Sequence, residues 1–408
     1  MANKYHDDTL IINDSLMPGA HKDPYGAVVP PIYQNSLFTF DSWDAIETAF
    51  DDKINNSIYT RGNNPTVTLA EQKIAMLAGN SVNSDGQDSH KGKLFASGMA
   101  AISAGILHFL SAGDHMITLK NTYGPAISLI NDFIVPKMEV SVSYVSGRDI
   151  EEIASLIRPN TRLIYLESPT SVVFSLQDLA KVAELAKRHG IATMIDNTWA
   201  TPIFQKPLTL GIDLEVHSCS KYLGGHSDIV AGVLIGRQKL IDAIHVREYE
   251  LLGACMSPMQ AWLLLRSLRT LDLRMARHQQ SALKVAQFLE QHPAIEQVNY
   301  PGLESFAQHQ LAKTQMSGFS GLLSFRLRSS QPDDVKNFFN HLKLFQIGVS
   351  WGGHESLIYA PAISCLKEQS FAQFKKMGIA IGDMRISVGL ENADDLIADL
   401  AASLALAL

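Results

Sequence analysis

The sequence predicts an α/β protein built on a large, mostly parallel sheet, with a smaller α+β layer after it and an irregular arm before it. Short runs that are apolar throughout alternate with helix-periodic segments from about residue 94 onward. Such runs are typical of parallel strands covered on both faces. Later strand-like runs, GLLSFRL and MRISVGL, lie among further helical segments. The first 65 residues are polar, with turn signals at MPGA, DPYG and VVPP.

The large sheet is predicted from the runs KLFA, HMITL, LIYLES, IATMID, GIDLEV and IVAGVLIG. Between them, residues 150–157 place apolar side chains at i, i+3, i+4 and i+7, which is one face of a helix. A second helix follows LIYLES, and we expect Ser175 as its N-cap, Asp178 three residues later and Gly190 as its stop. The order of strand and helix therefore favours a parallel sheet.

A long helical stretch beginning near residue 259 links this sheet to the smaller layer, which has further helices near 332–342 and 392–406. We read the polar segment 80–93 as a surface loop without chemistry. The predicted units are an N-terminal arm (1–65), a large domain (66–262) and a small C-terminal domain (263–408). An arm of this length is too long for a simple loop, and we expect it to pack on a neighbouring subunit.

Composition excludes several classes of function. The 408-residue chain is 46% hydrophobic and 18% charged, which is ample for buried cores and unlike a disordered protein. Its net charge is −7 and it has no basic run, so nucleic acid is not an expected partner. Its apolar runs are too short to span a membrane, and its N-terminus lacks a targeting pattern. We therefore expect a soluble, cytoplasmic protein.

Three cysteines, Cys219, Cys255 and Cys365, lie far apart in the chain. Their odd number argues against a disulfide framework, and no C-x-x-C spacing suggests a metal site. We expect no metal centre.

Candidate functional residues stand at the carboxyl ends of the predicted strands, where open α/β sheets bind ligands. KLFA leads into Gly98 and Met99 at a helix start, which suits an anion. Tyr123 follows HMITL, Asp196 ends IATMID, and Lys221 follows GIDLEV. Each also has a purely structural interpretation: a tight turn, a packed ring, a helix cap or a lysine that reaches the surface.

Taken together, these strand ends supply an anion cradle, an aromatic face, a buried carboxylate and an amine. Pyridoxal phosphate needs all four, for its phosphate, its ring, its pyridine nitrogen and its aldehyde. A desolvated lysine has a lowered pKa and becomes a nucleophile able to bond an aldehyde. The sequence therefore predicts a pyridoxal phosphate site.

The motifs SGMAAI, NTYGP, ESPTSVVF, DNTWATP, SKYLGGHSD, SLRTLDLRMARH, SWGGHESL and MRISVGLEN occur in this order along nearly the whole chain. In this it resembles the cysteine/methionine-metabolism family of pyridoxal phosphate enzymes. The family includes cystathionine β- and γ-lyases, methionine γ-lyase and homoserine-ester transferases. The resemblance implies the aspartate-aminotransferase-like fold (type I), with a seven-stranded-type sheet in the large domain.

The resemblance also implies roles for the strand-end residues. Lys221 would bond the cofactor aldehyde and carry the Cα proton, Asp196 would pair with the ring nitrogen, and Tyr123 would stack on the ring and assist the substrate amine. The phosphate would be held by Gly98, Met99, Ser218 and Ser220.

Residues outside the strand ends gain roles only through this resemblance. Tyr59 and Arg61, in IYTRGNNPT, would reach the cofactor phosphate of the neighbouring subunit, and a homotetramer of dimers with shared active sites is then expected. Arg385 would clamp the substrate carboxylate, while Ser350 and Trp351 would line the substrate pocket. Without the resemblance, Arg61 and Arg385 would be interpreted as surface charges.

Within the family, SWGG, ESPTSVVF and SLRTLDLRMARH look most like cystathionine β-lyases. Val349 stands where enzymes acting at Cγ commonly have glutamate, although methionine γ-lyases have valine there and β-lyases often tyrosine. Pro125 occupies the place of the characteristic cysteine of methionine γ-lyases. Ser171 replaces an asparagine that many relatives place near the cofactor hydroxyl, a departure that β-lyase-like members share.

This resemblance implies β-elimination of a sulfur-containing amino acid, L-cystathionine, to homocysteine, pyruvate and ammonia in methionine biosynthesis. The alternatives are a γ-lyase that forms 2-oxobutyrate from methionine or cystathionine, a homoserine-ester sulfur transferase, and a protein that binds pyridoxal phosphate without catalysis.

Overall fold

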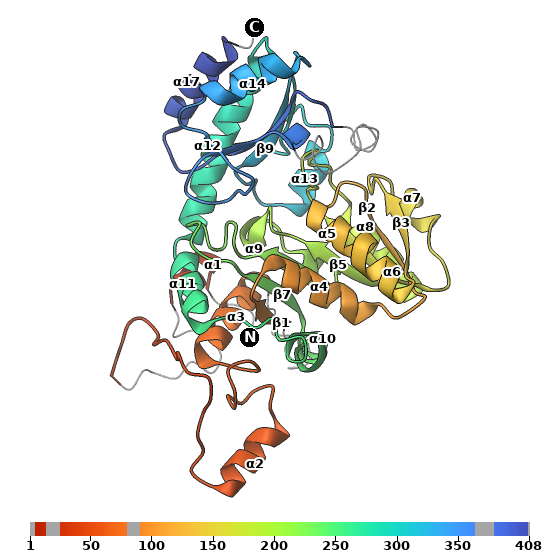
Figure 1. The fold of residues 1–408 in the computed structure, drawn as a ribbon, viewed down its shortest axis with the longest axis vertical. Helices are drawn as coiled ribbons and strands as arrows, with labels where there is room; N and C mark the ends of the chain where they lie inside the picture. Colours follow the sequence, from red (N-terminus) through yellow and green to blue (C-terminus); the bar gives the residue numbers. More distant parts are fainter. Residues whose placement is uncertain (1–4, 14–24, 80–89, 364–378, 407–408) are drawn as a thin grey trace.

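The computed structural model describes residues 5–13, 25–79, 90–363 and 379–406. A seven-stranded sheet with the order β1-β7-β6-β5-β4-β2-β3 forms the larger part (Figure 1). β2, β3, β4, β5 and β6 pair in parallel, while β7 pairs antiparallel with both β1 and β6. Its strands are β1 (His90–Phe95), β2 (His115–Leu119), β3 (Ser141–Val145), β4 (Thr161–Glu167), β5 (Ala192–Asp196), β6 (Leu214–Ser218) and β7 (Gly232–Arg237).

Both faces of this sheet are covered, as neighbouring residues of β5 demonstrate. Met194 belongs to one buried cluster with Ile102 of α4 (Gly98–Phe109), whereas Ile195 belongs to another with Val182 of α8 (Leu179–His189). The predicted parallel sheet between two helical layers is therefore confirmed. The helices of this part are α4 (Gly98–Phe109), α5 (Gly124–Ser128), α6 (Val135–Met138), α7 (Ile150–Ala154), α8 (Leu179–His189), α9 (Thr201–Phe204) and α10 (Gln238–Ile244), with helical turns at Leu129–Ile134, Pro207–Leu210 and His245–Tyr249.

The start of α8 differs from the prediction. Its N-cap is Asp178, whose carboxylate accepts the Lys181 N–H at 3.2 Å. Ser175 was the wrong cap, because its hydroxyl is buried three residues earlier against that of Thr170, 2.9 Å away. The end is as predicted: Gly190 takes a left-handed φ of 65° that favours glycine.

A second sheet of five strands, with the order β10-β11-β12-β9-β8, lies beside the first (Figure 1). β9 (Leu322–Leu327) and β12 (Asp383–Ser387) are the two strands predicted from GLLSFRL and MRISVGL, and they pair antiparallel. The other three strands of this sheet were not predicted, since they are short or largely polar. The other elements are β8 (Ile295–Asn299), β10 (Gln346–Ile347), β11 (Leu357–Tyr359), α13 (His309–Gln315), α14 (Pro332–His341) and α17 (Ala393–Leu404).

Two helices, rather than one, connect the sheets: α11 (Pro258–Leu268) and α12 (Leu271–Gln291). At the break, the Ser267 carbonyl accepts the Thr270 N–H at 3.2 Å and Arg274 Nη2 at 3.0 Å. The buried guanidinium of Arg274 also donates to the Tyr222 carbonyl at 2.6 Å, so the break is tied to the segment that follows Lys221. From there α12 extends alongside the second sheet (Figure 1).

The N-terminal part contains α1 (Asp7–Ile12), α2 (Trp43–Asp51) and α3 (Pro65–Leu77). It is less irregular than predicted, because α2 is a capped helix that projects away from both sheets (Figure 1). Most of the predicted loop 80–93 lies outside the described residues. Its last four residues, His90 to Lys93, correct that prediction, since they form the first part of β1. Within the described chain, no helix is long and apolar enough to cross a membrane.

Candidate active site

A cavity of about 470 Å³ opens at the carboxyl ends of β4, β5 and β6, where residues of the second sheet's loops complete its wall. Its size suits a small organic ligand. Nine residues proposed from the sequence line it: Gly98, Met99, Tyr123, Asp196, Ser218, Ser220, Lys221, Ser350 and Trp351.

An anion cradle forms where α4 begins. Ser97 caps the helix by accepting the Ala100 N–H at 3.1 Å, so that the first N–H groups of α4 remain available. A Cβ on Gly98 would lie only 2.9 Å from the Ser218 Cβ, so glycine is what allows this close approach. Ser220 exchanges hydrogen bonds with the Ala231 backbone, and the Ser218 hydroxyl adjoins the helix start. Backbone donors, hydroxyls and the helix dipole together suit a phosphate.

Asp196, the last residue of β5, supplies a buried carboxylate. Its Oδ1 accepts the Thr198 N–H at 2.9 Å and the Thr198 hydroxyl at 2.5 Å. Burial raises the pKa of Asp196, whereas these two hydrogen bonds and the positive charges of His217 and Lys221 lower it. Among the described residues, these hydrogen bonds leave Oδ2 available for a cation in the cavity. A protonated pyridine nitrogen would be such a cation.

Lys221 extends from the turn after β6 into the cavity. Its Nζ donates to the Ser350 hydroxyl at 2.5 Å and lies 5.5 Å from the centre of the Trp351 ring. Burial and the charge of Arg385 lower the pKa of this amine to about 8, with Asp196 acting in the opposite direction. A substantial fraction of the amine is therefore neutral, and nucleophilic, near physiological pH. The lysine is held in a site and does not simply reach the surface.

Tyr123 stands directly before α5, lines the cavity and is 42% exposed. Its N–H donates to Glu167 Oε2 at 2.6 Å, which fixes the main chain at this residue. Burial and the charge of Asp196 raise the pKa of Tyr123, so its hydroxyl is protonated at neutral pH. Glu167, also in the cavity wall, was missed by the sequence analysis, although as the last residue of β4 it satisfied the strand-end rule.

The second sheet contributes residues from the opposite side. Arg385, in β12, donates from Nη2 to the Val349 carbonyl at 2.5 Å, and its guanidinium lies 5.1 Å from the centre of the Tyr359 ring. Arg385 does not line the cavity itself. Its positive charge nevertheless lowers the pKa of Lys221, so the guanidinium acts electrostatically on the cavity.

Tyr59 and Arg61 are not brought to this cavity. They lie between α2 and α3, where the Arg61 guanidinium is 5.2 Å from the centre of the Tyr59 ring. Their predicted role at a neighbouring subunit's cofactor stays a prediction.

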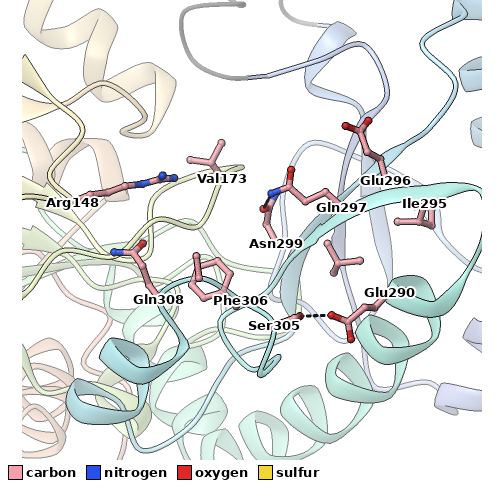
Figure 2. Close-up of a pocket in the computed structure, with 12 residues that line it drawn as sticks. Arg148, Val173, Glu290, Ile295, Glu296, Gln297, Asn299, Ser305, Phe306 and Gln308 are labelled. Carbon is pink, nitrogen blue, oxygen red and sulfur yellow. Dashed lines mark hydrogen bonds between the residues drawn. The ribbon is translucent and has the colours of Figure 1, made fainter.

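A second cavity, of about 380 Å³, lies between β8 and the segments that carry Arg148 and Val173 (Figure 2). Its wall combines apolar residues with the polar side chains of Gln297, Asn299 and Gln308 (Figure 2). None of the residues proposed from the sequence lines it. The chemistry therefore belongs to the first cavity.

Pyridoxal phosphate fits the first cavity on three observations. The Gly98–Ser218 cradle offers donors to a phosphate, and the Lys221 amine has a lowered pKa. The Asp196 carboxylate is buried, and among the described residues its hydrogen bonds go to Oδ1, which leaves Oδ2 for the ring nitrogen. Among the described residues, no group of three or more histidine, cysteine, aspartate or glutamate side chains could hold a metal ion. Cys219 and Cys255 are free thiols, and Cys365 lies outside the described residues.

Comparison with known proteins decides the family. The sequence model of the family described as Cys/Met metabolism PLP-dependent enzyme matches residues 9–405 of this chain. The chain belongs to this family. It is 39% identical over 388 residues to the L-methionine gamma-lyase of Fusobacterium nucleatum subsp. nucleatum, covering 95% of each chain. It is 37% identical over 403 residues to the cystathionine beta-lyase of Coxiella burnetii, covering 98% of each chain.

A solved structure supports the same assignment. It is that of a putative O-acetylhomoserine (thiol)-lyase from Campylobacter jejuni, which carries N'-pyridoxyl-lysine-5'-monophosphate. The two chains share 31% identity with a TM-score of 0.89, over 98% of this chain and 100% of the other. The protein is thus a pyridoxal phosphate-dependent enzyme of fold type I, and the predicted cofactor and fold class are confirmed.

Proposed function

We propose that this enzyme is a carbon–sulfur lyase that cleaves L-cystathionine by β-elimination, giving homocysteine, pyruvate and ammonia. The observation that supports it is the meeting of the Lys221 amine, the Asp196 carboxylate and the Tyr123 ring in one cavity of a Cys/Met metabolism family member. The likeness to the Coxiella burnetii cystathionine beta-lyase over nearly the full length of both chains supports this substrate.

The reaction divides among a few side chains. When bound, pyridoxal phosphate supplies an electron sink for the substrate's Cα. The Lys221 amine takes the Cα proton, and the Cβ–S bond then breaks with its electron pair leaving on sulfur. The protonated Lys221, or the Tyr123 hydroxyl, returns a proton to that thiolate. Asp196 keeps the ring nitrogen protonated, since a close negative charge raises its pKa. Water then converts the remaining fragment to pyruvate and ammonia.

Residues of the second sheet bind the substrate. Arg385 contacts its carboxylate through the guanidinium, which a lysine could not reproduce in bidentate form. Ser350 holds the Lys221 amine by a 2.5 Å hydrogen bond and so aims the base. Trp351 closes the apolar side of the cavity beside that amine.

One observation favours β- over γ-elimination. Pro125 stands at the start of α5 in place of the cysteine that the resemblance associates with methionine γ-lyases.

A second candidate function is γ-elimination of methionine to 2-oxobutyrate, and specific relatives favour it. Besides the Fusobacterium nucleatum protein, the L-methionine gamma-lyase of Treponema denticola is 37% identical over 94% of this chain. The two functions differ in the keto acid that they release, so one assay separates them.

The test is to offer L-cystathionine and L-methionine separately and to identify the keto acid by mass. Pyruvate from cystathionine supports the proposal; 2-oxobutyrate from either substrate, without pyruvate, contradicts it. Lys221→Ala should abolish turnover, whereas Lys181→Ala, on the exposed face of α8, should keep it. Bound cofactor without any keto acid would favour a non-catalytic protein.

We further propose a cytoplasmic homotetramer of dimers with shared active sites, serving methionine biosynthesis. Trp43 is 79% exposed on the projecting helix α2, which suits burial against another subunit (Figure 1). Arg61 would then contact the neighbour's cofactor phosphate. Arg61→Ala and Lys221→Ala should each be inactive, but mixing them should restore activity. In a mixed dimer, one site takes Lys221 from the first variant and Arg61 from the second, so that site is intact. Failure of the mixed, re-assembled variants to recover activity would contradict shared sites.

A further inference from the structure

The structure places a second buried carboxyl beside Asp196. Glu167 ends β4 and Asp196 ends β5, and the two are opposite each other in the parallel register. Residues paired in this way project from the same face of a sheet, so both carboxyls enter the same cavity. Glu167 is 8% exposed and Asp196 9%.

The two carboxyls have different partners. Glu167 Oε2 accepts the Tyr123 N–H at 2.6 Å, and Oε1 lies 2.6 Å from the Ser171 hydroxyl oxygen. Asp196 instead accepts two hydrogen bonds from Thr198 on one oxygen. Glu167 therefore joins the main chain of the ring-stacking tyrosine to a hydroxyl in the cavity wall.

Charge decides which member of the pair holds a proton. Two adjacent buried carboxylates cannot both be ionised at low cost. Thr198, His217 and Lys221 all favour the charged form of Asp196. Burial and the charge of Asp196 raise the pKa of Glu167 to about 8, against the opposite effect of the hydrogen bonds that Glu167 makes with Ser171 and the Tyr123 N–H. The titratable or charged groups that face Glu167 from the surrounding elements are Asp196, Tyr123, Tyr165 and Arg385.

We propose that Glu167 is a positioning residue that keeps its proton at neutral pH, so that Asp196 is the ionised member of the pair and Ser171 accepts the hydrogen bond from Glu167. With the proton on Oε1, the carboxyl donates to Ser171 Oγ while Oε2 still accepts the Tyr123 N–H. The Ser171 hydroxyl proton is then free to be donated to a ligand in the cavity. The inference rests on the proposed function only for the identity of the substrate.

Infrared spectroscopy of the cofactor-free protein tests the location of this proton. We expect a protonated-carboxyl C=O band at pH 7 that shifts when glutamate carries a ¹³C carboxyl, and that E167Q lacks. Raising the pH should remove this band with a midpoint near 8, the pKa of Glu167. The proposal is overturned if the protonated-carboxyl C=O band shifts when aspartate, instead of glutamate, carries the ¹³C label. It is also overturned if E167Q leaves every protonated-glutamate C=O band unchanged.

Cofactor binding gives a second readout. In E167Q the amide oxygen can accept the Tyr123 N–H and the amide NH₂ can donate to Ser171, as the protonated acid does. E167A loses both contacts, so its dissociation constant for pyridoxal phosphate should exceed that of E167Q by about tenfold. From pH 7 to 9 the wild-type affinity should fall more steeply than that of E167Q.

A matched control is E184Q, on the exposed face of α8, which should follow the wild type at every pH. Equal affinities of E167A and E167Q, or parallel pH dependences of E167Q and the wild type, would overturn the proposal. Neither readout involves an amino-acid substrate, so the outcome is independent of whether cystathionine is the one cleaved.

Discussion

Replacing Gly98 by alanine tests the phosphate cradle most sharply. The added Cβ would lie 2.9 Å from the Ser218 Cβ, 3.0 Å from its Oγ and 3.2 Å from its Cα. The first of these contacts is about 0.5 Å short of the 3.4 Å at which ordinary contacts begin. Ser218 ends β6, which is bonded to β5 on one side and β7 on the other, so its backbone cannot retreat. The start of α4 must therefore move away from Ser218.

This movement separates the N–H groups at the start of α4 from the hydroxyl of Ser218, which together form the cradle. Overpacking of this kind typically costs about 1–3 kcal/mol. If the cost falls on the cofactor-bound state, the dissociation constant of pyridoxal phosphate rises by roughly 5- to 150-fold. Gly124→Ala is the matched control: it also changes a glycine that begins a helix, but its Cβ would meet nothing within 4 Å.

The assay is titration of cofactor-free protein with pyridoxal phosphate, followed by absorbance, together with thermal unfolding of the same samples without cofactor. We expect G98A to bind weakly and G124A to bind like the wild type. Should G98A bind within about twofold of the wild type, the assignment of the α4 start as the phosphate site is wrong.

Three further predictions concern charged side chains. R385K should lower kcat/KM by roughly 10- to 100-fold, mainly through KM, because a charge-assisted hydrogen bond to the substrate carboxylate is lost. The control is R328K, whose arginine donates to the Pro293 carbonyl, and it should leave kcat/KM unchanged. K93M removes the 3.2 Å partner of buried Glu71 and should destabilise the cofactor-free protein by about 3–5 kcal/mol in urea unfolding, with K93M/E71L recovering much of the loss. The rate of cofactor attachment should rise with pH and level off above about 8, the pKa of the Lys221 amine; a continued rise toward the ordinary lysine pKa of about 10.4 would contradict it.

Much of the site could be predicted because its residues follow buried strands. The rule that parallel sheets bind ligands at their carboxyl ends identified Tyr123, Asp196 and Lys221, and the structure brings all three to one cavity. The same rule applied to LIYLES would have found Glu167. Its importance became visible only through the register of β4 with β5, which the sequence alone does not specify.

Other features depend on contacts that the sequence pattern does not specify. Ser175 was a plausible N-cap, but its hydroxyl pairs with that of Thr170, five residues earlier, and Asp178 caps the helix instead. The antiparallel direction of β7, which lies between β1 and the parallel strands, leaves no mark on an apolar strand. Arg385 could be proposed only through the family resemblance, because nothing near it in the sequence indicates that its charge acts on the Lys221 amine.

The most direct test of the central claim is to reduce the holoenzyme with borohydride, digest it and locate the pyridoxyl group by mass spectrometry. The label should lie on the peptide containing Lys221, and K221A should retain none. A label on another lysine, or a wild-type protein that cannot be labelled, would contradict the assignment of Lys221 as the residue that bonds the cofactor.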